Sequence, residues 1–193
     1  KYDDSIALLE RIKEDENYRD EYYLYTGYIY FEQGKYKEVV SLLNGIENKL
    51  TVNLQPYYQL ISRSAYNIKD YETSTKYYKL IATETNKIVN FYEYFKVASM
   101  NSSIEELEKL FLYYKENYKG TKDYAKDMYD IMGTAYANLN RNVEAEKIYL
   151  DALQITNDPL LVENLSIIQV RLKKFNEAYK NINSLEKTDS REL

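Results

Sequence analysis

The sequence has no cysteine, no histidine and no tryptophan among its 193 residues. Without cysteine and histidine it offers no thiol nucleophile, no imidazole base and no thiolate or imidazole ligand for zinc, so catalytic triads built on these groups are excluded. The groups left for chemistry are carboxylates, lysine amines, tyrosine phenols and hydroxyls. We therefore predict no cofactor and no metal site.

Glycine and proline are also scarce, with 5 and 2 residues respectively. Their usual shares are about 7% and 5% of a sequence, so turn-forming residues are rare and we expect a mostly helical chain. No apolar run approaches the roughly 18 residues that a membrane-spanning helix requires. We predict no direct membrane span.

A basic stripe is missing as well. The formal net charge is −5, and the lysines are interleaved with glutamates instead of being clustered. A nucleic-acid-binding surface needs clustered lysine or arginine to neutralise phosphates. We therefore expect no nucleic-acid partner.

What the sequence does contain is an internal repeat. Six short turn segments, each followed by an apolar helical pattern, place a reference residue at positions 2, 36, 71, 104, 142 and 175. These positions are 34, 35, 33, 38 and 33 residues apart. The spacing is close to the period of about 34 residues found in one class of helical-hairpin repeat.

The helices around the reference residues share one pattern. Side chains three residues after each reference residue are mostly small, and those seven and ten residues after it are apolar or aromatic, which places all three on one helical face. The preceding helix carries a small residue nine places before the reference residue and an aromatic residue six places before it. Gly27 with Tyr30 and Gly133 with Tyr136 are the clearest examples.

This pattern resembles the tetratricopeptide repeat family, in a divergent bacterial form. Its best copy is Tyr129-x2-Met132-Gly133-x2-Tyr136, which is followed by Ala145-x3-Tyr149 and by Pro159. Tyrosine stands where the family signature has tryptophan and phenylalanine. The resemblance covers nearly the whole chain and implies an all-α fold, a right-handed α-solenoid of stacked antiparallel helix hairpins with about eleven helices.

The repeat pattern predicts a single superhelical domain over residues 1–193, with a half repeat at 1–14 and repeats at about 20–49, 53–85, 87–118, 121–155 and 159–187. The predicted helices are Lys1–Glu14, Asp20–Gln33, Tyr36–Lys49, Asn53–Asn67, Tyr71–Thr85, Lys87–Met100, Ile104–Tyr118, Thr121–Leu139, Val143–Ile155, Pro159–Leu172 and Phe175–Lys187.

Two places depart from the pattern. In the third repeat, Phe95 stands where a small residue is expected. In the second repeat, Tyr66 and Tyr71 are one residue closer together than Tyr30 and Tyr36, which predicts a shortened turn and a local bend over residues 67–70.

The ends of the array lack covering helices. Residues 1–14 form the second helix of a hairpin without the first, so we expect the chain to be part of a longer protein. Terminal repeats need polar outer faces, and the uncapped ends here would allow homo-oligomers to form.

By resemblance, the first helices of the hairpins line a concave groove that receives an extended peptide or a partner helix. We predict that the groove is lined by side chains opposite the glycine and tyrosine packing positions: Leu24, Tyr28, Phe31, Tyr57, Leu60, Ser64, Tyr92, Lys96, Asp130 and Thr134. Part of the family clamps a terminal carboxylate with lysine and asparagine on these helix faces, whereas this chain has Leu24, Tyr28, Leu60 and Ser64 there, and carboxylates lie nearby. We expect a protein or peptide partner that is apolar or somewhat basic.

The predicted function is a non-enzymatic protein-interaction scaffold. An open groove lined by tyrosine and leucine offers no desolvated set of nucleophile, base and oxyanion donors. Two alternatives are a ligand-sensing repeat domain of a bacterial regulator and a structural component of an envelope or secretion assembly. Both a cytoplasmic and a periplasmic or envelope-associated location in a bacterium are compatible with the sequence.

Overall fold

A computed structural model describes residues 2–50 and 53–189, with side chains as far as Leu185. These residues form eleven α-helices and two short 3-10 helices, and the described chain contains no strand. The predicted all-α architecture is confirmed. The helices fall into two compact units, unit 1 (Lys1–Asn101) and unit 2 (Ser102–Leu193). The prediction of a single superhelical domain over both units stays a prediction.

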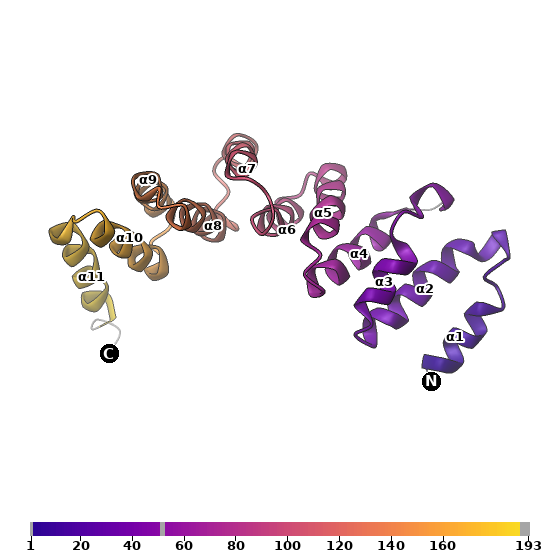
Figure 1. Cartoon of the computed structure of the whole chain (residues 1–193). Helices are drawn as coiled ribbons and strands as arrows, with labels where there is room; N and C mark the ends of the chain where they lie inside the picture. The colour runs from indigo at the N-terminus through magenta and orange to yellow at the C-terminus, as the bar shows by residue number, and fades with distance from the viewer. Residues whose placement is uncertain (1, 51–52, 190–193) are drawn as a thin grey trace. The chain divides into compact units, whose positions relative to one another are not determined.

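Unit 1 contains six α-helices that pack in chain order, each against the next, with α2 also against α4 (Figure 1). Their bounds are α1 Tyr2–Glu10, α2 Arg19–Glu32, α3 Tyr36–Leu43, α4 Gln55–Asn67, α5 Tyr71–Thr85 and α6 Ile88–Ala98, with 3-10 helices at Glu16–Tyr18 and Glu47–Lys49. The predicted helix start at Lys1 lies outside the described residues.

Unit 2 contains five α-helices that also pack in chain order, and α10 additionally contacts α8. Their bounds are α7 Ile104–Asn117, α8 Ala125–Asn138, α9 Asn142–Leu153, α10 Pro159–Arg171 and α11 Phe175–Asp189. The predicted third hairpin therefore has its first helix, α6, in unit 1 and its second helix, α7, in unit 2.

Four hairpins are closed by the same turn. In each, the backbone N–H before the second helix donates to a carbonyl five residues earlier: Lys35 to Tyr30, Asp70 to Ala65, Arg141 to Tyr136 and Lys174 to Gln169, at distances of 2.8 to 2.9 Å. The residue before each donor has a positive φ, between 59° and 70°: Gly34, Lys69, Asn140 and Lys173. This left-handed residue ends the first helix as a helix C-cap does. The shared turn fixes which residues of the four hairpins are equivalent.

The turn corrects the register of α4. Because Asp70 bonds to Ala65 just as Lys35 bonds to Tyr30, the residue equivalent to Tyr30 is Ala65 and not Tyr66. The prediction of a shortened turn over residues 67–70 is wrong, and the reason given for a local bend there disappears with it. The equivalent of Gly27 in α4 is then Ser62, which is fully buried.

Three predicted helix ends are also corrected. The first helix ends at Glu10, four residues earlier than expected, and α8 begins at Ala125 after Tyr124, which has a left-handed φ of 59°. The third helix ends at Leu43 because Asn44 is extended and Gly45 has a φ of 84°. The Tyr77 phenol in α5 caps this end, since it accepts the Gly45 N–H at 3.2 Å and lies 2.8 Å from Asn44 Oδ1.

Each unit has its own apolar core between the hairpins. In unit 1 the core contains Val39, Leu43, Ile46, Tyr57, Tyr58, Leu60, Ile61, Tyr77 and Ile81. Gly27 lets α2 approach α3, since a Cβ there would lie 2.9 Å from Leu43 Cδ1. In unit 2 a Cβ on Gly133 would lie 2.5 Å from Tyr149 Cζ. The small residues predicted at these positions are therefore required by close helix crossings.

Candidate functional site

The candidate site is the face of the first helices that points away from their packing partners. The shared turn identifies the equivalent positions, which lie three residues before and one and four residues after Gly27 and its counterparts. They are Leu24, Tyr28 and Phe31 in α2; Gln59, Arg63 and Tyr66 in α4; Asp130, Thr134 and Ala137 in α8; and Glu163, Ile167 and Val170 in α10. The matching residues of α6, counted from Ile104, are Tyr92, Lys96 and Ser99.

Seven of the ten predicted groove residues lie on this face. Tyr28 and Thr134 are exposed, and five are half-buried: Leu24, Phe31, Tyr92, Lys96 and Asp130. In unit 1, α2 and α4 pack against each other, and Phe31 and Arg63 make a direct contact across them. Unit 2 supplies Asp130 and Thr134 on its own face.

The other three predicted residues belong to the core and not to an accessible surface. Tyr57, Leu60 and Ser64 in α4 are 1%, 3% and 0% exposed. The Tyr57 hydroxyl donates to the Asp20 carbonyl at 2.6 Å, which ties α4 to the start of α2. The cause is the one-residue error in register, because a shift of one residue turns a helical side chain by about 100°. The residues that face outward in their place are Gln59, Arg63 and Tyr66.

Aromatic rings and cations alternate along the face of unit 1. The Arg63 guanidinium lies 4.8 Å from the centroid of the Phe31 ring. The Lys96 amine lies 5.9 Å from the Tyr66 centroid and 5.3 Å from the Tyr92 centroid. Contacts of this kind stabilise the positions of both partners. We call Tyr28, Phe31, Arg63, Tyr66, Tyr92 and Lys96 the unit 1 face.

The electrostatics beneath the unit 1 face centre on Tyr78 of α5. Burial, together with the Glu93 carboxylate, raises the pKa of Tyr78, while a hydrogen bond with Ser62 and the charges of Lys96 and Arg63 oppose that rise. Lys96 Nζ also pairs with Glu93 at 2.6 Å, and this pairing raises the pKa of Lys96 against the effect of its partial burial. At neutral pH, Tyr78 is a neutral phenol and Lys96 is charged.

On α8 of unit 2 the corresponding face is polar, with Asp130 and Thr134, whereas α10 exposes Ile167 and Val170. Asp130 Oδ1 accepts a hydrogen bond from Asn164 at 2.7 Å and another from the Tyr149 hydroxyl at 3.3 Å. The Tyr149 hydroxyl also lies 3.2 Å from Thr134 Oγ1. Burial raises the pKa of Tyr149 to about 12. The predicted groove residues of unit 2 are thus part of a hydrogen-bonded network that joins α8, α9 and α10.

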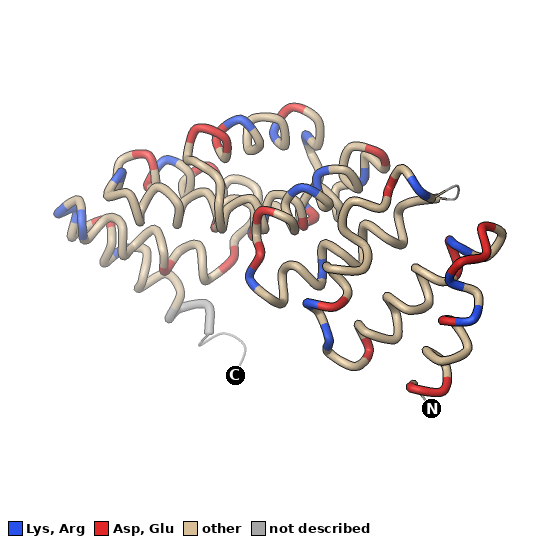
Figure 2. The backbone as a smooth tube through the Cα atoms, turned by 45° about the vertical axis from the view of Figure 1, so that its right-hand side comes forward, with Lys and Arg blue, Asp and Glu red and all other residues tan. Residues whose placement is uncertain are grey.

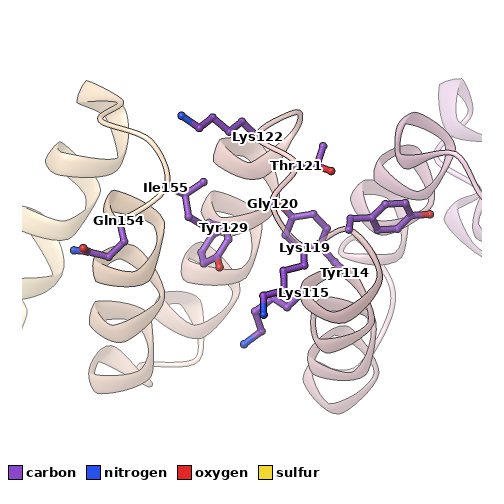
Figure 3. A pocket seen from close by; sticks show the side chains of 10 residues that line it. Tyr114, Lys115, Lys119, Gly120, Thr121, Lys122, Tyr129, Gln154 and Ile155 are labelled. Atoms are coloured by element: carbon purple, nitrogen blue, oxygen red, sulfur yellow. The ribbon is translucent and has the colours of Figure 1, made fainter.

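A pocket of about 460 Å³ lies elsewhere in unit 2, where α7, the 118–124 segment and the end of α9 meet. Its lining includes Tyr114, Tyr129 and Ile155. Figure 3 shows that Lys115 and Lys119 extend toward the same side of the pocket, whereas Lys122 points the other way. The lining contains three lysines and three tyrosines and no carboxylate.

Charge is distributed evenly over both units. Figure 2 shows basic and acidic residues interspersed along the helices, without a continuous basic stripe. Among the described residues, no group of three or more carboxylates is arranged to hold a metal ion. No helix in the described part of the chain combines the length and the apolar character needed to cross a membrane.

At the level of sequence, no family model matches the chain, and no curated protein matches it either. Solved structures do match it in three dimensions. MamA (residues 41 to the end) from Desulfovibrio magneticus RS-1 superposes with a TM-score of 0.65 and 13% identity, over 92% of this chain and 97% of that one. MamA MSR-1 gives a TM-score of 0.61 and 15% identity, over 91% and 99% of the two chains.

A thermophilic TPR protein of Thermus thermophilus also matches, with a TM-score of 0.51 and 12% identity, over 86% of this chain and 89% of that one. The chain has the tetratricopeptide-repeat fold. Because the identities are low, the TPR match concerns the fold alone.

Within the TPR hairpins, sequence reasoning missed Gln59, Arg63 and Tyr66 on the face of α4. A signal for them was present in the sequence. Ser62, at nine residues before Tyr71, is the small residue that the repeat requires, and it places Arg63 next to it on the outer face. The many tyrosines hid this signal, because Tyr66 resembled the tyrosine of the TPR signature.

Proposed function

We propose that the chain is a non-enzymatic scaffold that binds an extended peptide or a partner helix on the unit 1 face. The observation that carries this proposal is the row of aromatic and cationic side chains from three successive first helices. Tyr28 is 42% exposed and Tyr66 is 37% exposed, although both are large aromatic side chains. Exposed aromatic and arginine side chains are the residue types that most often dominate the binding energy at protein interfaces.

The chemistry of the face favours an apolar ligand. Phe31 and Tyr92 are half-buried and offer ring surface, while the phenols of Tyr28 and Tyr66 and the Arg63 guanidinium offer hydrogen bonds at the edge. Lys96 is already paired with Glu93, so it contributes less net charge. A peptide with one or two large apolar side chains fits this arrangement.

Weak acidity around the face favours basic residues at the ends of such a peptide. The first helices of unit 1 carry these acidic and basic residues: Asp20, Glu21, Glu32 and Glu93 against Arg19, Arg63 and Lys96. Glu21 and Glu32 are near the two ends of α2, and both are exposed. Opposite charges at the rim of an interface act mainly on the association rate and specificity, so the apolar contacts would supply most of the affinity.

The experiment selects peptides from a phage-displayed library on the purified chain and measures their affinity by fluorescence anisotropy. The double variant Tyr28→Ala/Arg63→Ala should weaken binding at least tenfold. Tyr113→Ala is the matched control, because Tyr113 in α7 is also 42% exposed but lies on a second helix. The proposal fails if both variants bind alike or if the selected peptides are insensitive to the double variant.

A further inference from the structure

A second surface, separate from the unit 1 face, lies on the last hairpin of unit 2. Side chains of α10 and α11 surround a hollow of about 680 Å³ whose lining is largely apolar. We call this surface the α10–α11 face. It is lined by Glu163, Ser166, Ile167, Val170, Arg171, Phe175, Ala178, Tyr179 and Ile182.

The α10–α11 face exposes positions that are core in the preceding hairpin. In α9, which packs against both α8 and α10, Tyr149 is 2% exposed and Glu146 is 7% exposed. The equivalent residues of α11, Ile182 and Tyr179, are 39% and 68% exposed. No described residue covers them. A contiguous apolar surface of this kind marks an interaction site on a folded protein.

The chemistry of the face differs from that of the stacking surface inside unit 2. There, Glu146 holds the next hairpin, since it pairs with Lys174 at 2.5 Å and lies 3.5 Å from the Gln169 amide. At the equivalent position of α11 stands Tyr179. A further hairpin with the same polar anchors as Lys174 and Gln169 would find Tyr179 in place of a carboxylate, so this part of the face is suited to an apolar partner surface.

The charges of α10 indicate which partner that is. Along its exposed stripe, Glu163 and Arg171 lie four residues on either side of Ile167, and Val170 lies between Ile167 and Arg171. If two such helices pack antiparallel with Ile167 opposite its own copy, each Glu163 meets Arg171 of the other helix, and apolar residues meet in the middle. The face is thus complementary to itself under a two-fold axis.

We propose that the α10–α11 face is a self-association surface, at which two copies of this chain pair about a two-fold axis near Ile167. The α10 and α11 helices of the two copies form a four-helix bundle that buries Ile167, Val170, Phe175, Tyr179 and Ile182. Burial of these side chains drives the association, and the two Glu163–Arg171 pairs fix its antiparallel register.

Sedimentation equilibrium over a range of chain concentrations tests the association. The wild-type chain should be dimeric, and Val170→Asp should raise the dissociation constant at least a hundredfold. Val143→Asp is the matched control, because Val143 is an exposed valine of α9 outside the face. A wild-type chain that stays monomeric at its highest soluble concentration overturns the proposal, as does a dimer that tolerates Val170→Asp. The first result would assign the face to a different protein or to a further helix.

Charge reversal tests the two-fold register. Glu163→Arg and Arg171→Glu should each raise the dissociation constant at least tenfold, because each brings like charges together twice. An equimolar mixture of the two variants should restore dimers, since one of the two pairs then joins Glu163 to Arg171 and the other joins the reversed residues of the variants. Arg171 also donates to the Ala137 carbonyl at 3.4 Å, so thermal unfolding of each variant is measured as well. Failure of the mixture to restore dimers rules out this register.

The absence of cysteine allows an independent test by cross-linking. Ile167→Cys places one thiol near the proposed axis, and mild oxidation should produce a disulfide-linked dimer in high yield. Leu150→Cys, on the exposed side of α9, is the control and should stay monomeric. Equal cross-linking of both variants contradicts the proposed axis.

Discussion

Two hairpins of unit 1 and two of unit 2 share the same turn and a small residue at the same position of the first helix, yet the two units use the outward face of their first helices differently. In unit 1 the face alternates aromatic rings with Arg63 and Lys96. In unit 2 the equivalent positions hold Asp130 and Thr134, which bond to Tyr149 and Asn164. The first face leaves large aromatic side chains accessible, whereas the polar groups of α8 in unit 2 join helices and only α10 leaves apolar side chains, Ile167 and Val170, accessible.

The side chain that faces the small residue at each helix crossing also differs between the two units. Gly27 faces the end of a flexible leucine side chain, while Gly133 faces a tyrosine ring whose hydroxyl is held by Thr134 and Asp130. The hairpin geometry constrains the turn and the crossing, and the outer face is free to differ. The two units therefore differ in the outer face of their first helices and not in the repeat signature.

The largest expected effect is alkaline unfolding, in which the two units should behave alike. Burial raises the pKa of Tyr114, Tyr136 and Tyr149 in unit 2 to about 12, and it raises the pKa of Tyr57 and Tyr77 in unit 1 as well. In the unfolded chain a tyrosine titrates near 10, so the unfolded state loses its protons first. The free energy of unfolding is therefore fully retained below pH 10 and falls between about pH 10 and 12.

Urea unfolding followed by circular dichroism, repeated at each pH, measures this loss. A free energy of unfolding that stays constant up to pH 12 would contradict the burial of these phenols. A loss of hydrogen-exchange protection confined to one unit would show that the two cores unfold separately.

The next largest effect is the change in stability when alanine replaces glycine, and it should differ between the two helix crossings. Gly133→Ala should destabilise the protein by about 1–3 kcal/mol, because the Tyr149 ring would have to move away from its hydrogen bonds. Gly27→Ala should change stability by less than about 1 kcal/mol, since Leu43 can rotate and alanine favours the helix by about 0.5–1 kcal/mol. Chemical denaturation of both variants measures these changes. Equal losses of stability would mean that the side chain facing the glycine does not determine the cost of the substitution.

A smaller effect tests the core position of Tyr57. Tyr57→Phe removes the hydroxyl that donates to the buried Asp20 carbonyl, and it should cost about 1–2 kcal/mol. Tyr28→Phe, on the exposed unit 1 face, should leave the melting temperature unchanged. If the two variants melt alike, the assignment of Tyr57 to the core is incorrect.

The smallest expected effect is the gain in stability when glycine replaces the lysines at the left-handed turn positions, and it should be equal in the two units. Lys69 and Lys173 have left-handed φ values of 63° and 62°, which favour glycine. Lys69→Gly and Lys173→Gly should each stabilise the protein by about 0.5–1 kcal/mol, because glycine adopts this conformation without a Cβ penalty. Lys79→Gly, at an exposed position within α5, should instead destabilise it by about 1 kcal/mol. Thermal melting of the three variants measures these changes in stability. Destabilisation by glycine at position 69 or 173 would contradict the shared turn.

The sequence alone predicted the helices and their pairing well, because both depend on local spacing. Gly27 and Gly133 lie where the periodic pattern requires a small side chain, and both helix crossings need one there. The end of α3 was not predictable in this way. It depends on Tyr77, which lies more than 30 residues away along the chain and caps Asn44 and Gly45.

The candidate site was predicted less completely than the fold. Leu24, Tyr28 and Phe31 were placed on the outer face because Gly27 fixed the register of α2. In α4 the side chains offered two registers, and only the backbone bond from Asp70 to Ala65 separates them. The pairing of Arg63 with Phe31 follows from that bond and from the packing of α2 on α4, neither of which is a property of local sequence.

The five-residue bond that closes four of the hairpins also bears on how the protein folds. Each such bond joins residues that are neighbours in the chain, so a hairpin closes with little loss of loop entropy. Within each unit, coupling passes between neighbouring hairpins, as in a row of linked two-state elements. Damage to one hairpin should therefore melt its immediate neighbours first, and the protein should unfold in stages that begin where the stack is weakest.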